Sequence, residues 1–248
     1  MQYLKVSIVT VTYNAQKTLG RCIQSVIAQN YPNIEYIVID GASTDNTSQI
    51  ISQYQSNIDV FVSKPDMGIY DAMNKGIKMA TGDIVGILNA DDYFADDNII
   101  TAVNEGFINS EADVIYGNLK YLNPNGAVVR KWKTGAYKHG MFNWGWMPPH
   151  PTFYCKRRLF EQHGLYNLQY GTAADYELML RFIHAKKASV YYLNKVMVNM
   201  IVGGVSNITY HNRIKAWGND FRAMRKNGVL FPQFCILLKP LRKIFQFI

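Results

Sequence analysis

The first ninety residues alternate between two patterns of apolar and polar positions. Short apolar runs rich in β-branched residues predict strands at 6–13, 34–40, 60–63 and 84–89. Segments with apolar side chains at helical spacing lie between them, at 17–30, 45–55 and 70–80. Continuous apolar strands that alternate with helices predict an α/β fold with a mainly parallel, Rossmann-like sheet covered on both faces.

The second half of the chain has a less regular pattern. Strand-like segments at 112–123 and 128–133 flank the turn "NPNG". A loop rich in Gly, Pro, Trp and His follows at 134–151, and its length is typical of a binding loop. A strand at 152–156, a short helix at 157–164 and a helix from about Ala174 to Ala185 are expected next.

Composition narrows the class of protein. Hydrophobic residues make up 48% of the 248 residues, which is typical of a globular chain. The 3 cysteines lie far apart without a CxxC pair, which argues against a disulfide framework or a zinc site and favours a reducing cytoplasm. No apolar run reaches the roughly 18 to 20 residues that a membrane-spanning helix needs, and the first residues are typical of a strand, not of a signal peptide.

The formal charge of +8 is concentrated in the last 38 residues. Residues 1–210 carry 18 Lys and Arg against 17 Asp and Glu, whereas residues 211–248 carry 8 against Asp220 alone. The body is therefore nearly neutral, and we do not expect a nucleic-acid partner.

Polar side chains follow each of the four predicted strands. In parallel sheets, ligands bind beyond the carboxyl ends of the strands. Two adjacent carboxylates, Asp91 and Asp92, follow the fourth strand, and no GxGxxG or P-loop motif follows any strand. If phosphates bind here, a divalent cation held by this pair is one way to neutralise them, and a solvated turn is the alternative.

Five segments resemble glycosyltransferase family 2, the inverting enzymes of the GT-A fold, over roughly residues 3–205. They are "VSIVTVTYNA" (6–15), "YIVIDGASTDNT" (36–47), "DMGIYDAMNKGI" (66–77), "LNADD" (88–92) and "GTAADYELMLR" (171–181). The resemblance implies a metal-dependent enzyme that uses a nucleotide-sugar donor. It also implies a nucleotide-sugar-binding half at 1–95, an acceptor-binding and catalytic-base half at 96–210 and a helical tail at 211–248.

The resemblance also implies roles on the donor side. Asp40 accepts a hydrogen bond from the base, the alternative being a charge for the next helix, and Tyr13 stacks on the base or packs in the ordinary way. Asp66 and Gly68 lie where the chain passes the ribose and phosphates, or form a plain turn. A carboxylate acceptor suits uracil or thymine, and a UDP-sugar is the expected donor.

The metal motif departs from the family pattern. Asp91 and Asp92 are expected to hold Mn²⁺ or Mg²⁺, but Asn89 stands where the usual DxD begins. Either Asp91 is the second acid of that motif or Asp91 and Asp92 form the working pair, and the sequence does not separate the two.

The base motif departs as well. Ala174 precedes Asp175 in place of the family's Glu, which leaves Asp175 as the expected general base. Thr172 and Asp175 also form a T-x-x-D capping pattern, and Glu177 is expected on another side of the helix.

The acceptor side is less defined. Trp144 and Trp146 form a plausible platform for a sugar ring, or they pack the loop against the core, and His150 is expected to bind a sugar or a diphosphate. "HPTFYCKRRLFEQHGLYN" and a later "GGVSN" resemble bacterial enzymes of O-antigen (lipopolysaccharide) and exopolysaccharide biosynthesis. This narrower resemblance implies a polyprenyl-diphosphate-linked saccharide as acceptor.

The tail mixes apolar and basic residues, as in "CILLKPLRKIFQFI" (235–248). This mixture suits a surface helix on anionic lipid, at the cytoplasmic face of the inner membrane, and the alternative is a helix that docks on the protein itself. A sugar nucleotidyltransferase and a non-enzymatic nucleic-acid-binding module are the rival functions. The sequence does not decide between a monomer and a homodimer, nor which hexose is transferred, with UDP-glucose one candidate donor.

Overall fold

The computed structural model describes residues 3–202 and 210–244, with their side chains except those of 210–215 and 243–244. The "GGVSN" motif and residues 245–248 of the tail lie outside the described residues. Within the described residues, no helix is both long and apolar enough to cross a bilayer.

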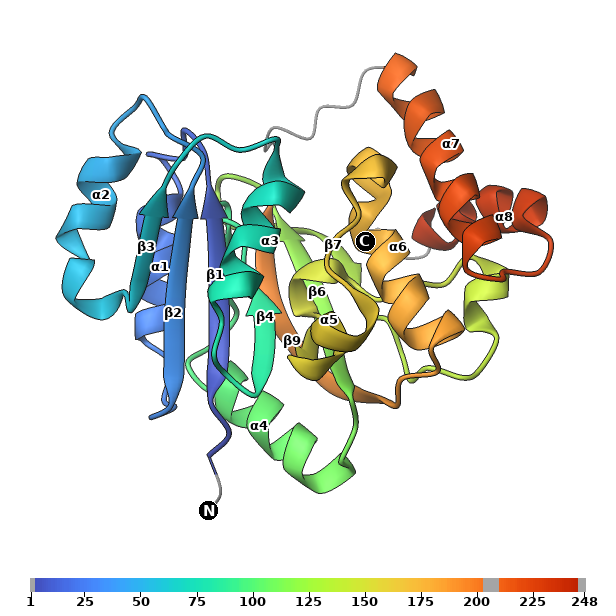
Figure 1. Ribbon diagram of the computed structural model, residues 1–248, viewed down its shortest axis with the longest axis horizontal. Helices are drawn as coiled ribbons and strands as arrows, with labels where there is room; N and C mark the ends of the chain where they lie inside the picture. Colours follow the sequence, from blue (N-terminus) through green and yellow to red (C-terminus); the bar gives the residue numbers. More distant parts are fainter. Residues whose placement is uncertain (1–2, 203–209, 245–248) are drawn as a thin grey trace.

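The strands that the structure describes form one mixed sheet in the order β3-β2-β1-β4-β8-β6-β9-β5, with β7 paired to β6 (Figure 1). The strands are β1 (Val6–Thr12), β2 (Ile34–Asp40), β3 (Val60–Ser63), β4 (Ile84–Ile87), β5 (Asp92–Phe94), β6 (Val114–Leu122), β7 (Val128–Trp132), β8 (Tyr154–Lys156) and β9 (Val190–Ile201). The α-helices are α1 (Leu19–Ile27), α2 (Thr47–Gln53), α3 (Ile69–Met79), α4 (Ile99–Ser110), α5 (Arg158–His163), α6 (Ala174–Met179), α7 (Tyr210–Lys226) and α8 (Pro232–Ile244).

The parallel half of the sheet matches the sequence prediction. Strand β1 pairs in parallel with β2 and with β4, and β2 pairs in parallel with β3. Beyond β4 the sheet becomes mixed, because β8 runs antiparallel to β4 and to β6, while β9 runs parallel to β6. Strands β5 and β9 and helix α4 were not predicted from the sequence.

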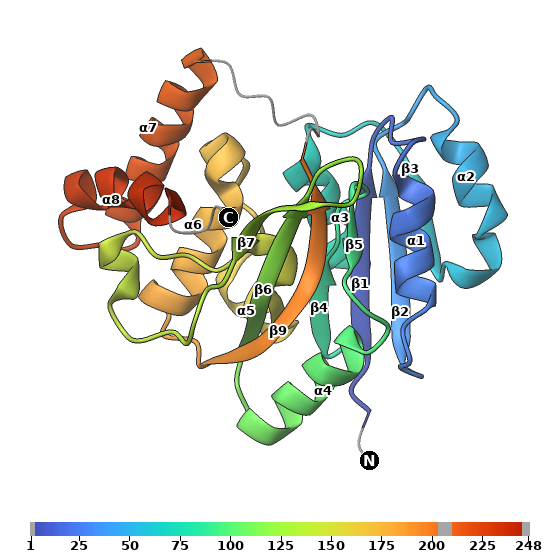
Figure 2. The ribbon, with the colours of Figure 1, turned by 180° about the vertical axis from the view of Figure 1, so that it is seen from behind.

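The central strands divide their side chains between two hydrophobic clusters. On β1, Ile8 packs on the face covered by α1 and α4, and Val9 packs on the face covered by α3 and α6 (Figure 2). Strand β2 repeats the division with Val38 and Ile39. Successive side chains of a strand point to opposite faces, so an unbroken apolar run fills both layers.

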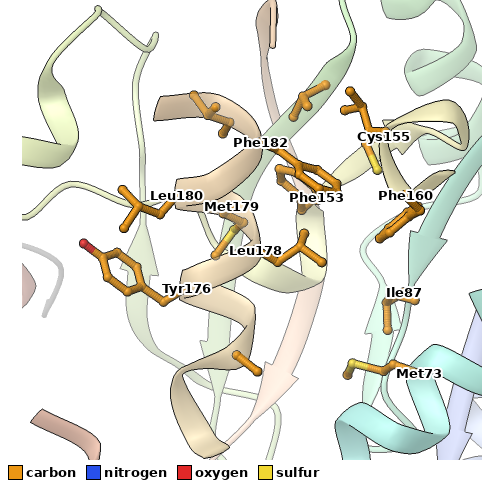
Figure 3. Packing of buried hydrophobic residues seen from close by; sticks show 14 of the residues in the cluster. Met73, Ile87, Phe153, Cys155, Phe160, Tyr176, Leu178, Met179, Leu180 and Phe182 are labelled. Carbon is orange, nitrogen blue, oxygen red and sulfur yellow. The ribbon is translucent and has the colours of Figure 1, made fainter. Parts of the chain in front are cut away.

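Helix α6 continues into a π-helical turn over Leu180–Ala185, and this combined segment is the centre of the second cluster. Leu178 and Phe182 lie toward Phe153 and Phe160, while Tyr176 points away from them (Figure 3). The segment therefore has two apolar sides, one on the sheet and one available to the C-terminal helices.

Helix α3 is fastened to the segment that leads into α6. The side-chain amide of Asn74 donates to the carbonyl of Tyr166 at 2.9 Å, and the backbone N–H of Tyr166 donates back to Asn74 Oδ1 at 2.9 Å. The rings of Tyr70 and Tyr166 pack with centroids 5.4 Å apart. These contacts fix the first turns of α3 against the element that precedes α6.

We expect Asn74→Ala to destabilise the fold. The change leaves the backbone N–H and the backbone carbonyl of Tyr166 without their partner. We therefore expect the free energy of unfolding to fall by about 1–3 kcal/mol and Tm to fall by several degrees. Thermal denaturation monitored by circular dichroism measures the effect. Asn109→Ala, at an exposed helical asparagine of α4, is the matched control and should change Tm by about 1 °C or less. Equal Tm values for both variants would contradict the role given to Asn74.

Candidate active site

The carboxyl ends of the parallel strands place two predicted donor-site residues, Tyr13 and Asp66, close together around Gly41. A Cβ atom added to Gly41 would lie 2.6 Å from Asp66 Oδ2 and 3.3 Å from Tyr13 Cδ2. The missing side chain therefore allows the carboxylate of Asp66 and the ring of Tyr13 to approach each other across the end of β2. Tyr13 is 63% exposed, so much of its ring is open to a ligand.

Asp66 also shapes the turn that leads into α3. Its Oδ1 accepts from the backbone N–H of Gly68 at 2.8 Å, and Gly68 adopts a φ of 107°, a region that favours glycine. The structure thus places Gly68 at the start of α3, directly beside the Asp66 carboxylate.

Asp40 lies below the surface at the carboxyl ends of the parallel strands. It is fully buried at the end of β2, and its carboxylate accepts from the backbone N–H of Ser43 and from the hydroxyls of Ser43 and Ser63, the last at 2.6 Å. The helix after it, α2, has its first turn bound instead by Asp45, which accepts from the N–H of Thr47 at 2.9 Å. Contact between Asp40 and a base would require one of the two hydroxyls to turn away.

The two adjacent carboxylates after β4 have different environments. Asp91 is half-buried at the surface, whereas Asp92 is 1% exposed and begins the short strand β5, paired with Met200 of β9. Burial, reinforced by the charge of Asp91, raises the pKa of the Asp92 carboxyl well above its usual range.

Three buried oxygens at the ends of β1 and β4 lack a hydrogen-bond partner among the described residues. They are Thr12 Oγ1, Asn89 Oδ1 and Asp92 Oδ1. The Asn89 amide donates to the other oxygen of Asp92 at 3.3 Å, which leaves Asp92 Oδ1 unsatisfied. Buried polar atoms are normally satisfied, and oxygens of this kind are the donors that Mg²⁺ and Mn²⁺ prefer.

The described residues contain no cluster of three or more His, Cys, Asp or Glu side chains placed to hold a metal ion. Mg²⁺ in nucleotide sites typically takes one or two protein carboxylates and completes its shell with phosphate and water oxygens. Asp91 and Asp92 match that type of site.

Asp175 lies in the first turn of α6 and contacts a residue of the long loop. His150 Nδ1 lies 3.3 Å from Asp175 Oδ2, and both side chains are partly exposed. The hydroxyl of Tyr70, on α3, lies beside the same carboxylate and donates to the carbonyl of Thr172 at 3.4 Å. Burial, with the nearby charge of Asp175, raises the pKa of Tyr70 far above its usual range, so its hydroxyl stays protonated.

The capping interpretation of Asp175 is wrong. The N-cap of α6 is Ala173, and no side chain caps it. Glu177 lies on another side of the helix, as expected, where it is buried in an ion pair with Arg181 at 3.0 Å. Asp175 is thus the acid of this motif that lies near the surface, where it contacts His150, whereas Glu177 is buried against Arg181.

The two loop tryptophans have different positions. Trp144 is 64% exposed, which is compatible with a platform for a sugar. Trp146 is buried against Tyr116, Tyr137 and Phe142, and its Nε1 donates to the carbonyl of Thr134. The prediction that Trp146 binds the acceptor is therefore corrected, because its ring fills the core under the loop.

Comparisons with known proteins agree with this geometry. The sequence model of glycosyl transferase family 2 matches residues 7–165. A PGL/p-HBAD biosynthesis glycosyltransferase of Mycobacterium bovis (strain BCG / Pasteur 1173P2) is 29% identical over 207 residues, which are 81% of this chain and 78% of the relative.

Solved structures share the fold. TarS of S. aureus in complex with UDP is similar with a TM-score of 0.69 at 18% identity, over 95% of this chain and 70% of that chain. The mannosyltransferase PcManGT from Pyrobaculum calidifontis, in complex with GDP-Man and Mn²⁺, is similar with a TM-score of 0.68 at 17% identity, over 97% of this chain and 73% of that chain.

The fold is therefore that of the GT-A glycosyltransferases. The chain belongs to glycosyl transferase family 2 and is a transferase enzyme. This membership decides against the two rival functions, a nucleotidyltransferase and a nucleic-acid-binding module.

Sequence reasoning did not find Gly41 or Tyr70. Gly41 stands where the family motif "DDGSTD" has its second Asp, and this departure was the available signal. Tyr70 lies inside the quoted segment 66–77, but its proximity to Asp175 depends on contacts between residues 102 positions apart.

We expect Gly41→Ala to weaken donor binding. The added Cβ would displace the Asp66 carboxylate from beside Tyr13, and we expect KM for the donor to rise about tenfold with kcat changed less. Steady-state kinetics measure this. Gly218→Ala is the control, since a Cβ there meets nothing within 4 Å. An unchanged KM in Gly41→Ala would show that the donor does not bind between Asp66 and Tyr13.

Proposed function

We propose that this enzyme transfers a hexose, with inversion, from a UDP-sugar to a lipid-linked saccharide during surface polysaccharide biosynthesis. The observation that carries the proposal is the pair of carboxylates Asp91 and Asp92, with unsatisfied oxygens beside it, on the same sheet edge as Tyr13 and Asp66. The run β3-β2-β1-β4 followed by β8-β6-β9 supports a division into a donor half (1–95), an acceptor and base half (96–210) and a C-terminal tail (211–248), with β5, paired to β9, as the exception.

The donor nucleotide is proposed to bind at the ends of β1, β2 and β3. The exposed ring of Tyr13 stacks on the base, and Asp40 accepts its N–H once a serine hydroxyl turns away. Asp66 and Gly68 meet the ribose and phosphates at the start of α3. The likeness to TarS in complex with UDP supports uracil as the base. PcManGT is in complex with GDP-Man, so a guanine nucleotide is the alternative to compare experimentally.

Asp91 and Asp92 are proposed to hold Mn²⁺ or Mg²⁺. Asp91 is the more accessible ligand, and Asp92 supports it from beneath through the oxygen that has no other partner. A bound divalent cation stabilises the negative charge that develops on the departing nucleoside diphosphate. The likeness to a structure that contains Mn²⁺ supports this site.

Asp175 is proposed as the general base. The acceptor hydroxyl attacks the anomeric carbon of the sugar while its proton passes to the Asp175 carboxylate. The bond between that carbon and the phosphate oxygen breaks, and the electron pair leaves with the nucleoside diphosphate. His150, in contact with Oδ2, is proposed as a positioning residue that turns the other oxygen toward the acceptor.

The acceptor is proposed to be a saccharide on a polyprenyl diphosphate, taken up at the cytoplasmic face of the inner membrane. Trp144 offers an exposed ring for a sugar on the acceptor side. O-antigen and exopolysaccharide assembly both use such acceptors, and the resemblance of residues 150–167 and 174–181 supports this class.

Thermal stability with nucleotides tests the donor and metal sites. We expect UDP to raise Tm more than GDP or dTDP, and only with Mn²⁺, because Asp91 and Asp92 would hold the cation, which would neutralise charge on the diphosphate. Asp91→Asn should abolish the rise in Tm that depends on Mn²⁺. Asp97→Asn, at an exposed acid nearby, is the control and should leave it intact. A shift without metal, or none with any nucleotide, would refute the proposed donor site.

Kinetics of variants test the base. We expect Asp175→Asn to lower kcat by about 10²- to 10⁴-fold without loss of the UDP-dependent stabilisation. His150→Ala should lower kcat in the wild-type background and cause no further loss in Asp175→Asn, because it acts through that carboxylate. The exposed His139, on the same loop, provides the control His139→Ala. Additive losses from His150 and Asp175 would exclude a positioning role.

A further inference from the structure

Helix α8 presents different residues on opposite sides. Cys235 and Lys239, one helical turn apart, face the body: Cys235 Sγ donates to the carbonyl of Phe142 at 3.1 Å, and Lys239 Nζ lies 3.6 Å from the ring centroid of Tyr176. Lys239 also pairs with Asp220 of α7 at 2.7 Å. One face of α8 is therefore docked on the protein.

Gly145 is part of this docking contact. It adopts a φ of 73°, and a Cβ there would lie 2.7 Å from the backbone nitrogen of Lys239. The backbone of α8 therefore lies directly against the loop that carries Trp144. The position of the helix is fixed by a close backbone approach as well as by polar contacts.

The other face of α8 is apolar and exposed. Phe234, Leu237 and Leu241 recur at the i, i+3, i+7 spacing of one helix face and are 52–66% exposed. Leu230 and Phe231, in the turn before the helix, extend this surface and are 62% and 70% exposed. We call these five residues the α8 apolar face.

The turn that presents Phe231 is strained. Phe231 has a φ of 52°, a region in which bulky residues are rare outliers. Its ring nevertheless stands in solvent, where it packs edge-on against Phe234 with centroids 6.5 Å apart. The carbonyl of Phe231 accepts from the backbone N–H groups of Phe234 and Cys235 at the start of α8, so the strained residue begins the helix while its ring stays unburied.

Exposed basic residues lie on α8 itself and on α7, the helix that packs against it. Arg222, Arg225 and Lys226 on the last turns of α7 line, with Tyr170 and Phe221, a shallow hollow of about 350 Å³, and Arg242 is exposed on α8 itself. An apolar helix face bordered by Lys and Arg is the pattern of helices that lie in the interface of an anionic bilayer.

We propose that the α8 apolar face inserts into an anionic lipid surface, with the α7 cations on the headgroups. Helices α7 and α8 lie on the side of α6 away from β1, β2 and β3 (Figures 1 and 2). Attachment there places α6, which carries Asp175, between the membrane and the donor edge. The inference rests on the proposed function only in its choice of acceptor, since lipid binding is measured without any transfer reaction.

Flotation of the full-length protein with vesicles tests the proposal. We expect binding to vesicles of phosphatidylglycerol and phosphatidylethanolamine, and little to phosphatidylcholine vesicles. Phe234→Ser with Leu237→Ser and Leu241→Ser should lower binding about tenfold or more, because three apolar side chains no longer leave water. The triple variant Arg225→Gln, Lys226→Gln and Arg242→Gln should bind anionic vesicles less, and its binding should depend less on salt concentration.

The matched control replaces exposed apolar residues elsewhere, as Ile27→Ser with Ile108→Ser and Val129→Ser, and should bind like the wild type. Equal binding by the Phe234, Leu237 and Leu241 variant would overturn the proposal. So would a wild-type dimer that this variant converts to monomer without any vesicle binding, since a second copy would then occupy the face.

Stabilisation by UDP and Mn²⁺, measured on the same proteins, separates this proposal from the proposed function. Retained stabilisation with lost flotation shows that the variant is folded and that the face binds lipid. Absent stabilisation in the wild type contradicts the donor site and leaves the flotation result standing.

Discussion

The arrangement of the site depends on the contact between helix α3 and the segment before α6. The donor edge and the proposed base belong to parts of the chain about 100 residues apart, and neither can act unless they are held at a fixed separation. The reciprocal bonds between Asn74 and the backbone of Tyr166 provide that constraint. Because α3 begins at the turn shaped by Asp66 and carries Tyr70, one short helix connects the proposed donor edge with the residue beside Asp175.

The end of β4 shows how the fold accommodates two neighbouring acids. One carboxylate stays near the surface, and the other is drawn into β5, where burial disfavours its charge. A buried oxygen without a hydrogen-bond partner is costly, so it gains from any positive group that reaches it. Within this chain, the order of residues "NADD" thus produces two carboxylates of unequal burial, and the Asn89 amide donates to the inner one.

The first half of the fold was predictable because its information is local. Each apolar run that is buried on both faces is long enough to be recognised, and the turns between strands and helices are polar. Strand β5 has three residues and its partner β9 lies about 100 residues later, so its existence depends on tertiary pairing that no window contains. Likewise, the sequence places Trp144 and Trp146 in one loop, but only packing separates the exposed ring from the buried one.

The same reasoning applies to the sites. Asp91 and Asp92 were singled out as adjacent carboxylates at a strand end, whereas Asp175 was singled out by the resemblance of its segment to the family's base motif. Their differences in burial, and the partners His150 and Tyr70, arise from side chains that meet across the fold. A single sequence therefore indicates which residues can do the chemistry, and the packed structure indicates how each is held.

The two faces of α8 make the two interpretations of the tail, docking on the protein and lying on lipid, compatible with each other. A helix docked on the body and a helix on a membrane need different faces, and α8 has both. Because the contacts of Lys239 and Gly145 restrict the motion of α8, its outer face has a fixed orientation relative to α6. A rigidly held apolar face orients the whole enzyme on a surface, which a flexible tail could not do. If the acceptor is confined to a lipid surface, an enzyme held in one orientation on that surface keeps Asp175 at a short, constant distance from the acceptor. The enzyme then does not have to meet the acceptor by diffusion in three dimensions.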